Sequence, residues 1–263
     1  MLGCSVGTVG DIDKDDYDDI IFGGCGKSSK RGAAYIIYGG TSFSSFSLTT
    51  TMSHLTRGFM ILGKSAGDFL GFSGRTAGDV NNDEYSDIVV GAYGRSSNRG
   101  EAYVIYGGER SSFQDIIDLS TTTLTPATNG FTLTGDTGSN NFFGQSVSSA
   151  GDMNKDGYDD ILIGAYGSVQ GKAYVIYGAE KTSLRNFDFS SYTLDIDTTG
   201  FTMNGNYVGS RFGFYVSPAG DVNKDGYDDI IVGSLLKGAA YVIHASKCEI
   251  LRLFNLYFSM PCS

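Results

Sequence analysis

Short apolar runs alternate with polar turns along the chain, and no stretch places apolar residues at the sustained 3.6-residue spacing of a helix. The runs DIIFGG (residues 19–24) and DILIGA (160–165) are rich in β-branched residues, and each is followed by a run such as AAYIIYGG (33–40) or KAYVIYGA (172–179). β-Branched and aromatic residues favour strands, and the glycines between them favour tight turns. We therefore predict an all-β protein with little helix.

The same segments recur four times at matched offsets. A repeated Gly-Asp pair supplies the alignment, with spacings of 68, 73 and 69 residues between Asp11, Asp79, Asp152 and Asp221. Two strong strand segments follow the Gly-Asp pair, and then come a weaker segment (45–50, 115–120, 187–192) and a Gly-Phe segment that leads into the next copy (58–63, 130–135, 200–205).

About four short strands per copy predict a single β-propeller domain built from four-stranded antiparallel blades, or a stacked β-array. The predicted blades cover residues 1–56, 57–125, 126–196 and 197–263. A sandwich of unrelated hairpins is the alternative, and the matched offsets disfavour it. The segment 247–263 matches no other copy, and we expect it to replace the missing outer strand of the fourth blade.

An acidic loop follows each Gly-Asp pair, as in GDMNKDGYDD (151–160). If the first Asp is position 1, acids or amides fall at positions 1, 3, 5 and 9, and a Tyr at position 7 offers its backbone carbonyl. This is the front half of an oxygen-ligand calcium loop. An EF-hand would carry Glu at position 12, where this chain has Ile163, so an EF-hand is excluded.

The loops predict up to four Ca²⁺ ions, and Mg²⁺ is disfavoured because it demands tight octahedral geometry. The predicted ligands, with each Tyr acting through its carbonyl, are Asp11, Asp13, Asp15, Tyr17 and Asp19; Asp79, Asn81, Asp83, Tyr85 and Asp87; Asp152, Asn154, Asp156, Tyr158 and Asp160; and Asp221, Asn223, Asp225, Tyr227 and Asp229. Gly157 and Gly226 hold position 6 in two copies, whereas Asp16 and Glu84 replace that glycine in the others. Because Glu tolerates a left-handed turn poorly, we expect the second copy to bind most weakly. Solvated Asp/Asn turns are the alternative.

The unit from 143 to 167 resembles the FG-GAP repeat of integrin α-subunit propellers: Phe143–Gly144 matches the "FG", and Gly164–Ala165–Tyr166 stands at the "GAP". The resemblance extends to about residue 246. The first two copies have Leu in place of Phe, and the Pro of "GAP" is replaced throughout, by Cys25, Tyr93, Tyr166 and Leu235.

The resemblance implies a seven-bladed propeller of which this chain shows four repeats, and we expect the chain to be a fragment of it. It implies structural calcium at the face opposite the ligand-binding face, and a role in cell adhesion with an integrin β-like partner chain. It also implies an alternative, a non-catalytic accessory module of a secreted enzyme, such as a phospholipase D acting on glycosylphosphatidylinositol anchors. A carbohydrate-binding propeller is a further alternative, because Tyr is abundant, although most Tyr recur at strand positions where core packing explains them. The function we favour is a calcium-binding adhesion or ligand-binding propeller whose loops bind a protein or glycan ligand.

The net charge and the composition limit the classes of partner, the location and the activity that we expect. The net charge of −10 and the absence of a long basic cluster argue against nucleic acid and anionic membranes. No span long enough to insert into a bilayer and no signal peptide is visible. Calcium loops of this kind are tuned to extracellular calcium, so we expect a cell-surface or secreted location.

The cysteines and histidines give no sign of a catalytic site. The four Cys leave disulfide pairing open. The two histidines, His54 and His244, lie in no catalytic motif, so we expect no enzyme activity.

Overall fold

The computed structural model describes residues 3–42, 52–138 and 140–246. The described residues form strands and turns, together with four short helical segments: α1 (Lys27–Lys30), α2 (Arg95–Asn98), η1 (Arg110–Ser112) and η2 (Leu235–Lys237). The prediction of an all-β fold is therefore confirmed. The predicted weak strand at 45–50 and the tail 247–263 lie outside the described residues.

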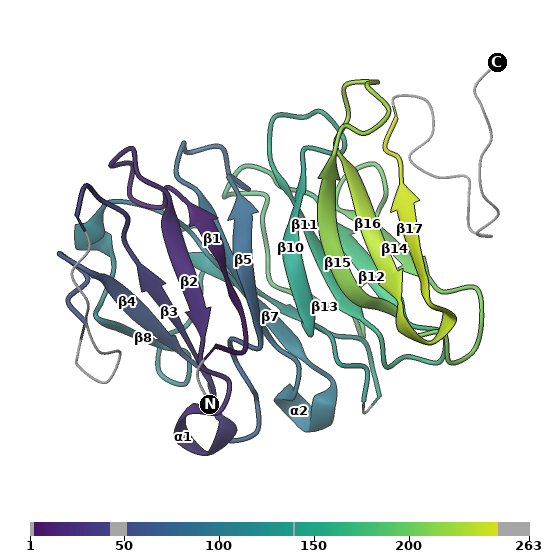
Figure 1. The fold of residues 1–263 in the computed structure, drawn as a ribbon, viewed down its shortest axis with the longest axis horizontal. Coiled ribbons are helices and arrows are strands. Elements are labelled where there is room, and N and C mark those ends of the chain that lie inside the picture. The colour runs from purple at the N-terminus through teal and green to yellow at the C-terminus, as the bar shows by residue number, and fades with distance from the viewer. Residues whose placement is uncertain (1–2, 43–51, 139, 247–263) are drawn as a thin grey trace.

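Four sheets lie side by side in chain order, from the purple sheet to the yellow one (Figure 1). The first contains β1 (Val6–Gly10), β2 (Asp19–Gly23), β3 (Ala33–Ile37), β4 (Gly58–Leu62) and β8 (Ile116–Asp118). The second contains β5 (Ser73–Gly78), β6 (Asp87–Ala92), β7 (Glu101–Ile105), β9 (Gly130–Thr134) and β13 (Phe187–Asp188). The third contains β10 (Ser146–Gly151), β11 (Asp160–Ala165), β12 (Lys172–Ile176) and β14 (Gly200–Asn204). The fourth contains β15 (Phe212–Gly220), β16 (Asp229–Ser234) and β17 (Ala239–Ile243).

Neighbouring strands in these sheets are mostly antiparallel. In the first sheet β3 pairs with β4, from Ala33↔Leu62 to Ile37↔Gly58. The Gly-Phe segment that begins at Gly58 thus belongs to the sheet before it, and the same holds for β9 and β14. The hydrogen-bonded sheets are therefore offset from the predicted sequence units, the first of which ends at residue 56.

The weaker strand segments pair differently from the prediction. β8 pairs in parallel with β4 of the preceding sheet, and β13 pairs in parallel with β9 in the same way. The first two sheets thus have five strands rather than four, and the fourth has three described strands. An edge strand with unpaired backbone groups accepts a crossing segment, and β4 and β9 offer such edges to the long connections that pass them.

Adjacent sheets approach so closely that their contact requires glycine. A Cβ added to Gly91 would lie 1.8 Å from the carbonyl oxygen of Gly144, and one added to Gly164 would lie 2.0 Å from that of Gly213. Gly91 and Gly164 open the "GAP" positions, and Gly144 and Gly213 close the "FG" pairs of the next unit. The two ends of the repeat are therefore the two sides of one junction between sheets.

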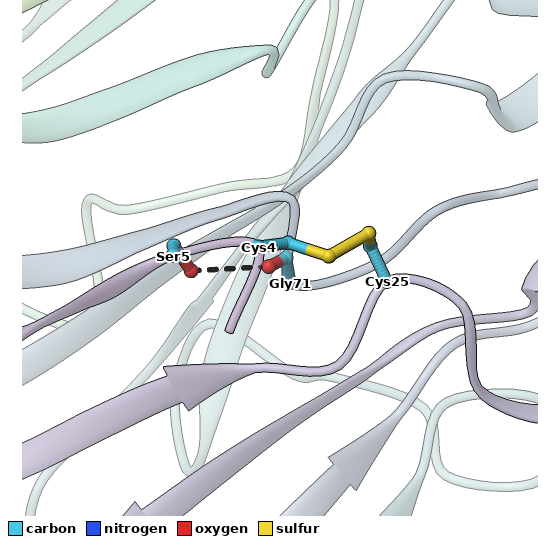
Figure 2. Close-up of a disulfide and its surroundings, with 4 residues drawn as sticks. All are labelled: Cys4, Ser5, Cys25 and Gly71. Carbon is cyan, nitrogen blue, oxygen red and sulfur yellow. Dashed lines mark hydrogen bonds between the residues drawn. A yellow bond between two sulfur atoms is a disulfide. The ribbon is translucent and has the colours of Figure 1, made fainter. Parts of the chain in front are cut away.

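The equivalent junction between the first two sheets lies at Gly23, where an added Cβ would be 1.8 Å from the carbonyl oxygen of Gly71. A disulfide joins Cys4 to Cys25 beside it (Figure 2). Next to it, Ser5 Oγ donates a hydrogen bond to the carbonyl oxygen of Gly71, at 3.0 Å. In the second unit the equivalent residues are Phe72 and Tyr93, whose rings meet edge to face with centroids 4.8 Å apart. The disulfide thus replaces an aromatic contact, and Cys248 and Cys262 lie outside the described residues.

Candidate metal centre

Each acidic loop leaves its first strand at a β-bulge. The pairing shifts register just before Gly10 and just before Gly151, which pair with Asp19 and Asp160 respectively. Both glycines have positive φ, of 72° and 71°, a conformation that glycine adopts without steric cost. The Gly of the repeated Gly-Asp pair therefore turns the strand into the loop. The four loops are called loop 1 (11–19), loop 2 (79–87), loop 3 (152–160) and loop 4 (221–229).

The Asp at position 1 organises every loop through the same bonds. In loop 3, Asp152 Oδ1 accepts the backbone N–H of Asp156 at 3.2 Å, and its Oδ2 accepts that of Gly157 at 3.0 Å. The position 5 carboxylate in turn accepts the N–H of the following Tyr, as Asp156 does from Tyr158 at 3.0 Å. The same pattern recurs in the other three loops. The predicted repetition of the loops thus extends to their hydrogen bonds.

The turn residue at position 6 has positive φ in all four loops. The angle is 90° at Gly157 and 88° at Gly226, and it is 67° at Asp16 and 71° at Glu84. A side chain costs roughly 1–2 kcal/mol in this region. The structure thus supports the premise that loops 1 and 2 carry a strained turn, while their relative calcium affinity stays a prediction.

The Asp at position 9 anchors the loop to its sheet. Asp160 is fully buried; its Oδ2 accepts the N–H of Met153 at 2.9 Å, and its Oδ1 accepts that of Gly178 at 3.0 Å. Asp19 and Asp87 are held in the same way. Burial raises the pKa of Asp19 to about 7, against the opposing effect of its two N–H donors. Sequence reasoning assigned position 9 to the metal alone and missed this anchoring role.

The position 3 side chains of loops 1 and 2 carry unsatisfied oxygen atoms. Asp13 is 8% exposed and Asn81 is 7% exposed, and in both residues Oδ1 is buried without a hydrogen-bond partner. Carboxylate oxygens of Asp11, Asp13 and Asp15 lie within 4.8 Å of one another. Buried oxygens without donors, next to clustered carboxylates, fit a hard cation that binds oxygen. The residues present therefore fit calcium at loop 1, and the buried oxygen of Asn81 fits an oxygen-binding cation at loop 2.

Two cationic side chains reach loops 1 and 2 from the neighbouring unit. Arg110 forms ion pairs with Asp13 through Nε and with Asp15 through Nη2. Lys181 Nζ lies 2.6 Å from Asp83 Oδ2. Arg110 and Lys181 occupy equivalent places after the third strands β7 and β12. Sequence reasoning missed both, because they are 95 to 98 residues away from the carboxylates that they meet.

In loops 3 and 4, the Asn at position 3 forms hydrogen bonds with the Asp at position 5 of the same loop. Asn154 Nδ2 donates to Asp156 Oδ2 at 2.8 Å, and Asn154 Oδ1 accepts the N–H of Asp156 at 3.0 Å. Asn223 and Asp225 repeat this arrangement in loop 4. Among the described residues, no lysine or arginine forms an ion pair with the carboxylates of these two loops at positions 1 and 5.

A ladder of partly exposed aromatic rings lies at the opposite end of the sheets. Phe69 stacks on Tyr93 with centroids 5.1 Å apart, Phe142 stacks on Tyr166 at 4.9 Å, and Phe214 lies 4.8 Å from Tyr166. These residues precede the first strands or follow the second strands, so they lie away from the acidic loops that join those strands. The loops whose sequences differ most between the repeats, called the variable loops, also lie at this end: 94–100, 136–138 with 140–142, and 206–211. The sequence showed Tyr93 and Tyr166 in place of the "GAP" Pro, but sequence reasoning did not infer that their rings stack on Phe69 and Phe142.

The two histidines each contact a carboxylate. His54 Nδ1 lies 2.7 Å from Asp115 Oδ1, and His244 Nδ1 lies 3.1 Å from Asp229 Oδ2. His244 therefore meets a predicted ligand rather than only packing in the third strand. No described helix is long and apolar enough to cross a bilayer.

Comparison with known proteins identifies the repeats. A profile of the FG-GAP repeat matches residues 72–105, 143–176 and 214–243. Integrin alpha-6 from Gallus gallus is 33% identical over 160 residues, which cover 60% of this chain and 13% of that protein. Integrin alpha-4 from Xenopus laevis is 27% identical over 258 residues, or 96% of this chain and 21% of that protein. Integrin alpha-V from Gallus gallus is 28% identical over 237 residues, or 89% of this chain and 20% of that protein. The chain thus spans about a fifth or less of the length of these relatives.

Proposed function

We propose that this chain, which carries FG-GAP repeats and is similar to integrin alpha subunits over much of its length, is a non-enzymatic adhesion or ligand-binding propeller with calcium in its acidic loops. The unpartnered, buried Oδ1 atoms of Asp13 and Asn81 are the observation that carries the calcium assignment. In each loop the ligands would be the side chains at positions 1, 3, 5 and 9 and the Tyr carbonyl at position 7. Calcium would supply a charge that holds these oxygens together.

Calcium at these loops would be structural. The loops contact one another in series: the N–H of Asp79 donates to Asp159 Oδ2 at 2.8 Å, and the N–H of Asp152 donates to Asp228 Oδ2 at 3.1 Å. An ion that fixes position 1 of one loop therefore also fixes its contact with the next sheet. This arrangement supports a role in holding the sheets in register.

The exposed face of the fourth sheet supports further blades beyond it. Val222, at position 2 of loop 4, is 52% exposed, whereas Ile12, Val80 and Met153 at the same position are at most 1% exposed. Val242 of β17 is 43% exposed, although the equivalent residues of the first three sheets are fully buried. In the first three units the next sheet covers these positions. We propose that a further blade covers them in the complete propeller, seven-bladed as in the family that the chain resembles.

The opposite end is the proposed ligand surface. The variable loops and the aromatic ladder meet there, on a scaffold that the acidic loops brace from the far end. A protein ligand, with an integrin β-like partner chain, is the function that the similarity to integrin alpha subunits supports. The partly exposed rings also favour a glycan ligand as a second candidate, because sugars stack on aromatic faces. Binding of the purified chain to a glycan array, compared with binding to extracellular-matrix proteins, separates the two.

The disulfide supports an extracellular or cell-surface location. Disulfides form and persist in oxidising compartments, where calcium is also abundant enough to fill loops of this class. Cys4 and Cys25 are paired in the first unit.

A thermal melt with and without EDTA, followed by calorimetric titration with calcium chloride, tests the calcium assignment. We expect the melting temperature to rise with calcium concentration, because a ligand that binds only the folded state stabilises it. The titration should report up to four sites. An unchanged melting temperature together with no binding heat would refute the assignment.

A further inference from the structure

Loops 1 and 2 each receive a cation from the next unit, and the two cations come from equivalent positions of the repeat. The guanidinium of Arg110 lies 4.4 Å from the ring centroid of Tyr38, and Lys181 Nζ lies 5.1 Å from that of Tyr106. Tyr38 and Tyr106 are equivalent residues after the third strands of successive units. Each cation thus lies over the Tyr of the unit before it and points into that unit's acidic loop.

The two cations take acceptor sites that a calcium ion would use. Arg110 contacts the carboxylates at positions 3 and 5 of loop 1, and Lys181 contacts the position 5 carboxylate of loop 2. In each loop one position 3 oxygen is left buried without a donor, because neither cation reaches it. A guanidinium or ammonium group therefore balances the loop's charge but satisfies its oxygens only in part.

We propose that Arg110 and Lys181 are tethered counter-cations, which occupy loops 1 and 2 in the absence of calcium and must leave those carboxylates when calcium binds. The inference rests on the proposed calcium function, and it adds that side chains of this chain regulate calcium affinity at loops 1 and 2. Loops 1 and 2 exchange one cation for another, whereas loops 3 and 4 bind calcium without displacing a cationic side chain. Calcium binding at the first two loops therefore replaces the ion pair that these side chains form with the neighbouring unit, while the backbone contacts of Asp11 with Ser86 and of Asp79 with Asp159 remain.

The sequence of the fourth unit explains why loop 3 differs. Where the second and third units have Arg110 and Lys181, the fourth unit has Cys248, which carries no positive charge. Cys248 therefore cannot be a tethered cation for loop 3, and the neighbouring Lys247 lies outside the described residues. The chain offers loops with and without the counter-cation as an internal comparison.

A higher affinity of loops 3 and 4 would not by itself establish the proposal, because those loops also have Gly at position 6. The variants R110M and K181M isolate the charge, since Met keeps an apolar contact with the Tyr ring. K172M is the matched control: Lys172 also forms an ion pair, 2.6 Å from Asp136, at the end of the sheet away from the loops. Each variant of the full chain is titrated with calcium chloride in a calorimeter and melted in EDTA and in calcium.

We expect R110M and K181M each to tighten one weak calcium site by about tenfold, since removing a unit charge near the site is worth about 1.4 kcal/mol or more at a partly exposed position. In EDTA both variants should melt below the wild type, because the loop carboxylates lose their counter-charge. In saturating calcium that deficit should vanish. K172M should leave every calcium affinity unchanged.

The outcomes separate the proposal from the function on which it rests. If calcium binds but R110M and K181M bind it as the wild type does, the counter-cation proposal is overturned and the calcium function stands. An equal loss of stability with and without calcium would show a merely structural role for both side chains and would also overturn the proposal. If neither the wild type nor the variants bind calcium, the proposal and the calcium function fall together.

Discussion

Replacing Asp160 by Asn tests whether position 9 anchors the loop independently of any metal. The carboxylate of Asp160 is fully buried and accepts two backbone N–H groups, one on each oxygen. The two donors, Met153 and Gly178, lie on different segments, so the side chain ties loop 3 to the turn after β12. In D160N one oxygen becomes an NH₂ group, which cannot accept either N–H.

The expected cost follows from one lost hydrogen bond and one orphaned donor. A hydrogen bond to a charged group is worth about 1.5–3 kcal/mol, and a buried unsatisfied N–H costs about 1–3 kcal/mol. Relief of repulsion among the loop carboxylates offsets part of this. We therefore expect D160N to lower the free energy of unfolding in EDTA by about 3 kcal/mol, which corresponds to a fall of roughly 6–12 °C in melting temperature for a domain of this size.

The matched control is D156N at position 5 of the same loop. Asp156 is exposed; its Oδ1 accepts the N–H of Tyr158, which the Asn carbonyl can still accept, and D156N loses only the exposed bond from Asn154 Nδ2 to Oδ2. In EDTA we expect D156N to change the free energy of unfolding by less than about 1 kcal/mol. Both variants should lose the calcium-dependent rise assigned to loop 3. If D160N unfolds like the wild type in EDTA, the anchoring role is wrong and position 9 serves the metal alone.

Three further predictions concern pH, the disulfide and the junction between sheets. Because burial raises the folded-state pKa of Asp19 to about 7 from an unfolded value of 3.8, its contribution to stability is present below pH 3.8 and is lost as the pH rises through about 7. Urea unfolding in EDTA should therefore show about 2–4 kcal/mol less stability at pH 7.5 than at pH 4.5, and calcium should remove that loss. Breaking the Cys4–Cys25 bond, which closes a sequence separation of 21 residues, should cost about 3 kcal/mol, measured by unfolding before and after reduction. G164A places a methyl group 2.0 Å from a backbone oxygen of the next sheet and should cost at least about 1–3 kcal/mol in thermal or urea unfolding, whereas G233A, whose nearest neighbour is 3.5 Å away, should cost far less.

Each of these predictions has an outcome that contradicts it. A metal-free stability that stays level or rises between pH 4.5 and pH 7.5 would show that Asp19 is ionised in the folded state well below pH 7. Equal effects of G164A and G233A would mean that the close approach between sheets does not govern the "GAP" glycine. A reduced protein as stable as the oxidised one would mean that the first junction holds without its covalent link.

The strands were predictable because their signal is local. The β-branched runs that begin at Asp19 and Asp160 form β2 and β11, and both contain residues fully buried between sheets. The pairing of β8 and β13 was not predictable, because segments of three and two paired residues carry no register of their own. The strand with which each of them pairs depends on which edge strand of a neighbouring sheet is unpaired, and this is known only once the sheets have assembled.

The candidate site likewise has a part that the sequence predicted and a part that it could not predict. The spacing of the acidic loop predicted that Asp11, Asp13 and Asp15 would converge, and their oxygens lie within 4.8 Å of one another. The spacing could not predict Arg110, whose Gly-Gly-Glu-Arg segment has the composition of an ordinary turn. It reaches loop 1 only because successive sheets pack side by side, which brings residues almost one hundred positions apart into contact.

The contacts that hold an acidic loop are therefore understood only when neighbouring repeats are considered together. Each loop receives its position 1 and position 5 contacts from its own unit, but Ser86, Asp159 and Asp228 of the following units bind the position 1 backbone or its carbonyl. Arg110 and Lys181 also come from the following unit. Because loops 1 to 3 are each completed by the next sheet, an ion bound in one of them would stabilise a junction as well as a turn. Calcium at one end would then control how rigidly the sheets present the aromatic ladder and variable loops at the other.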